Sequence, residues 1–175
     1  MPYSTNLFQF SWEQNKGLDL EIINWESRVQ EKEFSPIILE MGMALYSAFR
    51  ELRTIRRIME EGKPGIEHSF YQVHFEIFSH NHFLSIALNR VLKILHIGYP
   101  EESQVIQNKY KDLIQQVNSY RNSLEHQTEI GKGKDAPSFF NNLSSKGYES
   151  NGNSLGYSDI EHLLNEVMAE LERNT

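Results

Sequence analysis

The chain has 175 residues, of which 39% are hydrophobic and 23% charged, and it contains no cysteine. This length supports one domain with a real core, and the missing cysteines exclude disulfides and thiolate metal sites. The formal net charge of −7 argues against broad attraction to nucleic acid, so any RNA contact requires locally concentrated positive charge. The start, MPYSTNLFQFSWEQ, lacks the features of a signal peptide, and no apolar run approaches about 18 residues. We therefore expect no membrane segment and a cytoplasmic location.

The N-terminal 34 residues leave two interpretations open. Apolar and polar residues alternate on both sides of the turn-like Asn15-Lys16-Gly17, first over 8–12 and then over 18–22. Such alternation favours a β-hairpin. Trp25 and Val29 are equally compatible with a short helix that leads into the rest of the chain.

From residue 35 onward the pattern is helical. Ser35-Pro36 is a helix start signal, with an N-cap followed by proline at the first helical position. Apolar residues follow at steps of three and four, namely Ile38, Met41, Leu45, Ala48, Leu52, Ile55 and Met59. Gly62-Lys63-Pro64-Gly65 ends this first helix. A second helix is predicted from about 66 to 97, where Gly98-Tyr99-Pro100 stops it; it is apolar on more than one side, as expected for the most central helix.

A third helix is predicted from about Glu101 to Thr128. Its core stripe repeats at steps of four and three and consists of Ile106, Tyr110, Leu113, Val117, Tyr120 and Leu124. Residues 129–157 are rich in Gly, Ser and Asn and predict a long loop. Ser158 to Glu161 matches a capping box that starts a last helix, ending near Arg173. The expected fold is all-α: residues 35–175 form an up-and-down bundle of four main helices, three long and one shorter C-terminal, preceded by a less regular N-terminal segment.

Three polar residues stand out near the end of the third predicted helix: Arg121, Asn122 and His126. On a helical wheel of about 100° per residue, Asn122 and His126 fall within about 140° of Arg121, whereas the core stripe lies near 300°. Asn122 and His126 are also four residues apart, so they are neighbours on the helix surface. The helix can therefore pack on one side and present these three side chains on another.

The run Arg121-Asn122-Ser123-Leu124-Glu125-His126 resembles the signature of the HEPN superfamily, an Arg-x(4 to 6)-His motif on a late helix of a helical bundle, usually with a polar residue after the arginine. Many HEPN proteins are metal-independent endoribonucleases that act as toxins or in phage defence, commonly as homodimers that bring two motifs into one cleft. The resemblance implies RNA or a nucleotide as ligand, a homodimer with the third helices near the interface, and a nucleotidyltransferase antitoxin as a further partner. It covers the helical portion, about 35–173, but its specific part is six residues long.

The chemistry of such a site requires neither a cofactor nor a metal ion. The 2′-hydroxyl of RNA attacks the adjacent phosphorus, His126 accepts or donates the proton, and Arg121 stabilises the charge on the phosphate while Asn122 orients it. Five further basic residues are candidate phosphate contacts, which supply the local positive charge: Lys132, Lys134, Arg50, Arg53 and Arg57.

Alternatives stay open beside the enzyme. A catalytically inactive HEPN-like module that binds nucleotide, RNA or a nucleotidyltransferase partner would keep the same motif, and a solvated helix face without a site would show the same pattern. The arginines of the first helix are equally compatible with a solvated face or with salt bridges. The four histidines at 68, 74, 80 and 82 lack the i,i+4 spacing of a helical zinc site, so no metal is expected.

Overall fold

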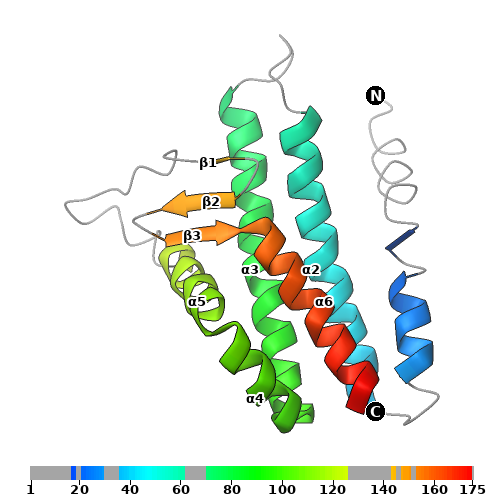
Figure 1. The fold of residues 1–175 in the computed structure, drawn as a ribbon. Coiled ribbons are helices and arrows are strands. Elements are labelled where there is room, and N and C mark those ends of the chain that lie inside the picture. The colour runs from blue at the N-terminus through cyan, green and yellow to red at the C-terminus, as the bar shows by residue number, and fades with distance from the viewer. Residues whose placement is uncertain are drawn as a thin grey trace.

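The computed structural model describes residues 17–18, 21–29, 36–61, 70–125, 143–144, 147–150 and 153–174. These residues are almost entirely helical, with one small sheet (Figure 1). The elements are α2 (Pro36–Glu61), α3 (Phe70–Gly98), α4 (Pro100–Lys109), α5 (Lys111–Glu125), β1 (Leu143–Ser144), β2 (Gly147–Ser150), β3 (Asn153–Gly156) and α6 (Tyr157–Asn174). No helix within these ranges is both long and apolar enough to cross a bilayer. The all-α class is thus confirmed for the bulk of the described chain.

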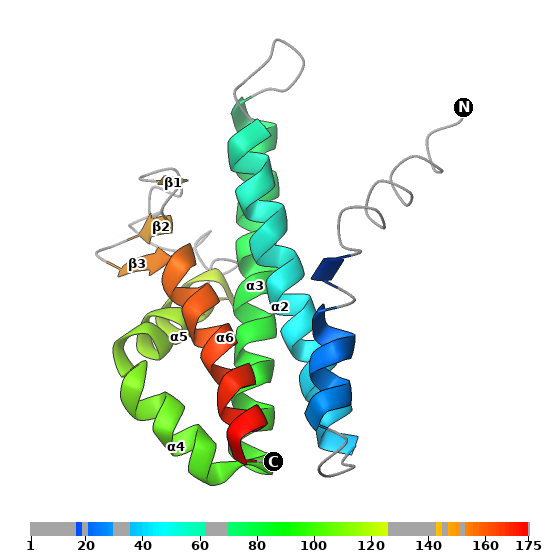
Figure 2. The same ribbon diagram turned by 45° about the vertical axis from the view of Figure 1, so that its right-hand side comes forward.

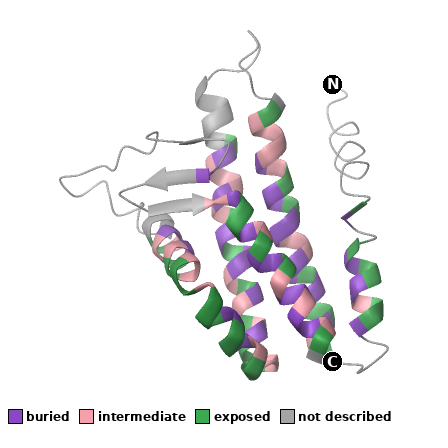
Figure 3. Cartoon of the chain, viewed as in Figure 1, coloured by how far each residue is buried: buried purple, intermediate pink, exposed green. Residues whose placement is uncertain are grey.

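Helices α2 and α3 form an antiparallel pair along the full height of the molecule (Figures 1 and 2). α2 begins at Pro36, as its sequence signal predicts, because proline fits the first turn of a helix, where no backbone donor is needed. The apolar stripe predicted on α2 is buried: Ile38, Met41, Leu45, Ala48, Leu52 and Ile55 are each at most 1% exposed. α3 contacts α2, α4 and α5 and therefore holds the central position expected of it. Figure 3 shows the buried residues of α2, α3 and α6 along the sides where these helices meet.

The N-terminal segment is helical where the structure describes it, over 17–18 and 21–29. The hairpin predicted around 15–17 is therefore wrong in its second strand, and its first strand lies outside the described residues. The correct period is helical, because Leu18, Ile22, Trp25 and Val29 recur at steps of four and three and are all buried. Trp25 anchors the segment by donating its Nε1–H to the carbonyl oxygen of Met168 in α6, at 3.1 Å.

The third predicted helix is bent and divides into α4 and α5 at Tyr110. Tyr110 connects the two helices: its N–H donates to the carbonyl oxygen of Ile106 in α4, and its own carbonyl oxygen accepts from the Ile114 N–H in α5, each at 2.9 Å. The Tyr110 hydroxyl donates to the carbonyl of His162 at 3.4 Å, which ties the bend to α6. The prediction of one uninterrupted helix from about 101 to 128 is therefore wrong at Tyr110, because α4 packs on α6 and α3 whereas α5 packs on α3 and β3; residues 126–128 lie outside the described residues.

A small antiparallel sheet with strand order β1-β2-β3 replaces part of the predicted loop. Tyr148 of β2 is paired with Leu143 of β1 and with Leu155 of β3. The loop prediction is wrong for these strands, because Gly-, Ser- and Asn-rich segments lack the β-branched residues by which strands are recognised. β3 runs directly into α6, which begins within one residue of the predicted capping box, and it packs against α5. The sheet therefore lies beside the helix that carries the Arg-Asn motif.

Candidate functional site

The first two motif residues lie near the C-terminal end of α5. Val117 and Tyr120 of the core stripe are each 3% exposed and hold the helix in place. Asn122 is exposed, as expected for a polar face, whereas Arg121 is half-buried one turn after the buried Val117 and borders the core stripe. His126, one position beyond the last residue of α5, lies outside the described residues, as do Lys132 and Lys134.

Three arginines of α2 form ion pairs within the chain, namely Arg50, Arg53 and Arg56. The pair of Arg53 is exposed, with Nη2 3.2 Å from Glu21 Oε2 in the N-terminal segment. The pair of Arg56 is half-buried, with Nη2 2.7 Å from Glu161 Oε2 in α6. Arg57, one turn further along α2, is half-buried. The main partners of α2 are α3 and α6, and those of α5 are α3, α4 and β3. The helical segment 21–29, which carries Glu21, lies on the side of α2 opposite α5 (Figures 1 and 2), so the structure does not bring Arg53 together with the Arg-Asn motif.

A buried carboxylate connects α2 to α3 and was not expected from the sequence. Glu51 is 4% exposed. Its Oε1 accepts hydrogen bonds from Arg50 Nε and Nη2, at 3.1 and 2.6 Å, and its Oε2 accepts from His80 Nδ1 at 2.6 Å. Burial raises the pKa of the Glu51 carboxyl, but the bonds from His80 and Arg50 outweigh burial and leave that pKa below its ordinary value. Arg50 and His80 are therefore engaged in a structural cluster, and the carboxylate fixes the proton of His80 on Nδ1.

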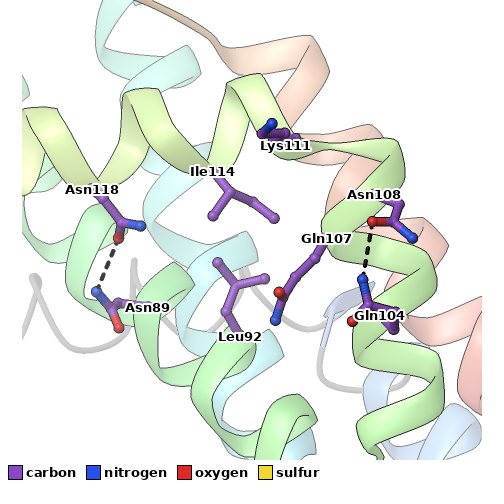
Figure 4. A pocket seen from close by; sticks show the side chains of 8 residues that line it. All are labelled: Asn89, Leu92, Gln104, Gln107, Asn108, Lys111, Ile114 and Asn118. Atoms are coloured by element: carbon purple, nitrogen blue, oxygen red, sulfur yellow. Dashed lines mark hydrogen bonds between the residues drawn. The ribbon is translucent and has the colours of Figure 1, made fainter.

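A pocket of about 490 Å³ lies on the inner side of the bend, between α3, α4 and α5 (Figure 4). Five of its lining side chains are carboxamides, two are aliphatic and one is a lysine. They are Asn89 and Leu92 from α3, Gln104, Gln107 and Asn108 from α4, and Lys111, Ile114 and Asn118 from α5. We call it the amide pocket. The sequence holds a signal for it, because Gln104, Asn108, Lys111, Asn118 and Asn122 recur at steps of three, four or seven and so share one face.

Hydrogen bonds between side chains fix the two ends of the amide pocket. Asn89 Nδ2 of α3 donates to Asn118 Oδ1 of α5 at 3.4 Å. Gln104 Nε2 donates to Asn108 Oδ1 at 3.0 Å within α4. Figure 4 shows these pairs at opposite ends of the pocket, with Leu92 and Ile114 facing one another between them.

The amide pocket continues toward the Arg-Asn motif along α5. Asn118 precedes Asn122 by four residues, about 6 Å along the helix axis, and points from the same face. His82 lies seven residues before Asn89, on the same face of α3. Since α5 runs antiparallel to α3 (Figure 1), His82 lies on the part of α3 level with the C-terminal end of α5. Its Nδ1 is buried and has no hydrogen-bond partner among the described residues, which makes His82 a second histidine to test at the site.

No group of three or more His, Asp or Glu side chains within the described ranges is arranged to hold a metal ion. His80 lies four residues after Glu76, the spacing at which two helical residues could share a metal ion. Its Nδ1 is instead hydrogen-bonded to Glu51. The absence of a metal from the function stays a prediction.

Comparisons with protein-family models, with curated proteins and with solved structures found no match. The HEPN resemblance therefore stays a prediction that rests on residues 121–126. Function has to be argued from the polar face of α5, the amide pocket and the chemistry of the side chains themselves.

Proposed function

We propose that this protein is a metal-independent endoribonuclease of HEPN type, with Arg121, Asn122 and His126 as its catalytic residues. The observation that carries the proposal is the position of the two motif residues on α5: Asn122 is exposed, and Arg121 is half-buried at the edge of the core stripe that Val117 and Tyr120 bury. A helix held in this way can present a guanidinium and a carboxamide to a ligand without disturbing the core. His126 follows directly after the last residue of α5, four positions beyond Asn122.

The proposed reaction is a transesterification within the RNA chain. His126, or its equivalent in a second copy, accepts the 2′-hydroxyl proton as O2′ bonds to phosphorus, and the bond from phosphorus to the 5′-oxygen breaks as that oxygen takes up a proton. Arg121 stabilises the negative charge on the non-bridging oxygens, with a planar, two-pronged geometry that lysine lacks. Asn122 orients the phosphate by hydrogen bonding. The products are a 2′,3′-cyclic phosphate and a 5′-hydroxyl.

The same proposal gives the helices an up-and-down bundle order, with α2, α3, the α4–α5 unit and α6 as its four members. The antiparallel packing of α2 on α3 supports this order. In a cytoplasmic homodimer, the α5 helices would lie near the interface, and a nucleotidyltransferase antitoxin would be the partner that restrains the activity.

Five basic residues are proposed as phosphate contacts: Lys132 and Lys134, which follow the motif in the sequence, and Arg50, Arg53 and Arg57 of α2, which would contact a part of the RNA away from the motif. The Arg53–Glu21 pair is exposed on both sides, at 42% and 52%, and such pairs contribute at most about 1 kcal/mol, so a phosphate can replace the glutamate. The Arg50–Glu51 pair contains a buried carboxylate and is harder to exchange.

The test is RNA cleavage by purified protein in the presence of EDTA. His126→Ala should slow cleavage by about 10²- to 10⁴-fold, the contribution typical of general acid–base catalysis, and Arg121→Ala and Asn122→Ala should also slow it. Arg90→Ala and His96→Ala are matched controls, because both residues are exposed on α3 and lie outside the proposed site. Cleavage that EDTA abolishes, or that persists unchanged in the His126 and Arg121 variants, contradicts the proposal.

A binding module without turnover is the second candidate, and the net charge of −7 favours it. In that case RNA, a nucleotide or a nucleotidyltransferase partner would bind to the same face without being cleaved. The cleavage assay combined with a binding assay separates the candidates. Binding that is lost in Arg121→Ala, with no cleavage by the unmodified protein, would select the binding module. His82→Ala should be assayed beside His126→Ala, since loss of cleavage in the first variant alone would move the acid–base role to α3.

A further inference from the structure

We propose that the amide pocket binds the carboxyl-terminal end of a peptide chain. In this proposal Lys111 binds the terminal carboxylate, the carboxamides bind the last peptide groups, and an aliphatic side chain packs against Leu92 and Ile114. The inference goes beyond the proposed ribonuclease, because it concerns a different ligand in a different part of the α5 face.

The carboxamides match the hydrogen-bonding groups of a peptide backbone. Each peptide group has one N–H donor and one carbonyl acceptor, and each Asn or Gln side chain has the same two kinds of group. After the bond from Asn89 to Asn118 is made, the Asn118 amide nitrogen and the Asn89 oxygen are not used in it. The pair of Gln104 and Asn108 likewise leaves the Asn108 amide nitrogen and the Gln104 oxygen. In Figure 4 the Asn118 nitrogen points toward the pocket and the Gln104 oxygen lies on its inner side, so the pocket offers a donor and an acceptor, the set that one peptide group needs.

The charge of the pocket fits a single carboxylate better than a nucleotide. Lys111 is the one charged residue among the eight that line the pocket, and no acidic side chain lines it. A phosphate monoester carries close to two negative charges at neutral pH and is usually bound by several cationic or backbone donors. The protein as a whole is acidic, which further disfavours a dianion, whereas one lysine balances one carboxylate.

The apolar part of the pocket points the same way. Leu92 and Ile114 are half-buried and face one another (Figure 4). No aromatic residue lines this pocket, although bases of single-stranded nucleic acids are usually held by stacking on aromatic rings. Two branched aliphatic side chains instead suit the side chain of a residue such as leucine or valine. The volume of about 490 Å³ lies within the range of small-ligand pockets, so a short chain end fits and a folded surface does not.

The experiment is a titration of the full ¹⁵N-labelled protein, followed by NMR through the side-chain NH₂ signals of its Asn and Gln residues. The probe is acetyl-Ala-Ala-Leu with a free carboxylate, and its matched control is the same peptide with a carboxyl-terminal amide. We expect the signals of the five lining carboxamides to shift, with a Kd of about 1 mM or tighter. The amide-capped peptide should bind at least about fivefold more weakly, because it lacks the charge-assisted bond to Lys111.

Two variants assign the role of the lysine. Lys111→Gln should weaken the free-acid peptide about fivefold or more and leave the capped peptide unchanged. Lys93→Gln is the control, because Lys93 is an exposed lysine of α3 that does not line the pocket, and it should change neither affinity. Both lysines are exposed, so both variants are expected to fold.

Three results would overturn the inference. The first is that the lining carboxamide signals do not move at millimolar concentrations of the free-acid peptide. The second is that the capped peptide binds as tightly as the free-acid peptide, or that Lys111→Gln binds the free-acid peptide as tightly as the unmodified protein does. The third is that adenosine monophosphate shifts the same signals at a lower concentration than the peptide, which would make the pocket a nucleotide site. No RNA is present in these measurements. A failure of the ribonuclease proposal therefore leaves them unaffected, and RNA cleavage without peptide binding would reject this inference alone.

Discussion

Replacing Glu51 by glutamine should lower the free energy of unfolding at pH 7 and remove part of the protein's sensitivity to acid. Glu51 is buried, and its two oxygens accept hydrogen bonds from Arg50 and His80. Glutamine has nearly the same shape but only one acceptor oxygen and no charge. One of the two partners therefore loses its acceptor, or His80 moves its proton to Nε2.

The magnitude follows from the exposure of the partners. A hydrogen bond to a charged group contributes about 1.5–3 kcal/mol when it is shielded from water. The side chains of Arg50 and His80 are 47% and 31% exposed, so water replaces part of what each loses. We therefore expect a loss of about 1–2 kcal/mol, which for a chain of this size corresponds to a Tm lower by about 2–8 °C.

The pH dependence supplies a second readout. The pKa of Glu51 is lower in the folded protein than in the unfolded chain, because the bonds from His80 and Arg50 outweigh burial. The stabilisation from this group is therefore fully present above the ordinary carboxyl range and is lost as the pH falls through the lower, folded value. Urea unfolding of the parent and of Glu51→Gln from neutral to acidic pH should show two curves that converge at low pH. Glu40→Gln is the matched control, because Glu40 is an exposed residue of the same helix.

The reasoning about this cluster would be refuted if Glu51→Gln unfolded at the same urea concentration as the parent at pH 7 and lost stability on acidification to the same extent. The cluster would also be refuted if Glu51→Gln lowered the free energy of unfolding only as much as Glu40→Gln does, since the buried and the exposed carboxylate would then contribute equally to stability.

Three other substitutions test the packing that positions the site. Trp25→Phe removes the bond to the Met168 carbonyl and part of a fully buried side chain, so thermal unfolding should reveal a loss of about 2–4 kcal/mol. Tyr157→Phe leaves the buried Asn81 amide, now 3.0 Å from the hydroxyl, without that partner and should cost about 1–3 kcal/mol in urea unfolding. Glu26→Gln should stabilise the protein slightly at pH 7, by at most about 0.5 kcal/mol. The reason is that burial raises the pKa of this carboxyl, so the gain should vanish below the ordinary carboxyl range; a gain that persists in acid would contradict it.

Sequence patterns predicted the long helices because their signals are redundant. Pro36 marks the start of α2, a stripe of seven apolar residues runs along it, and six of those seven are fully buried. Pro100 begins α4 and stops any continuation of α3. The start of α6 is similarly fixed by a polar capping signal that precedes an apolar stripe. Where a start signal, a stripe and a stop signal agree, one interpretation remains.

The errors arose where a pattern was short or where the deciding contact is distant in sequence. Leu18 and Ile22 fit both a strand period and a helix period, and only the continuation to Trp25 and Val29, all buried, selects the helix. The bend at Tyr110 accompanies different packing partners for α4 and α5 and a bond to His162, 52 residues away, and local periodicity does not reveal these distant contacts. Neither the secondary structure of the N-terminal segment nor the bend at Tyr110 could be predicted from the neighbouring residues alone.

The candidate site was predicted only in part. Helical periodicity predicts a polar face at Arg121 and Asn122; Asn122 is exposed as predicted, whereas Arg121 is half-buried because it borders the core stripe. The residues of α4 and α5 that line the amide pocket share a helical repeat that is visible in the sequence. Asn89 and Leu92 of α3 complete the pocket, and their approach to α4 and α5 depends on tertiary packing. The ion pair that engages Arg53 joins residues 32 positions apart and could not be read from composition.

Tyr110 joins α4 to α5 at a single residue, because its N–H bonds to Ile106 of α4 and its carbonyl oxygen to Ile114 of α5. The amide pocket is lined by side chains of both helices, so a change in the angle between α4 and α5 would widen or narrow it. A ligand in the amide pocket would thus change the orientation of the α5 face that carries Asn122. Ligand binding in the pocket and the position of the Arg-Asn motif would then be coupled through α5, without any residue contacting both.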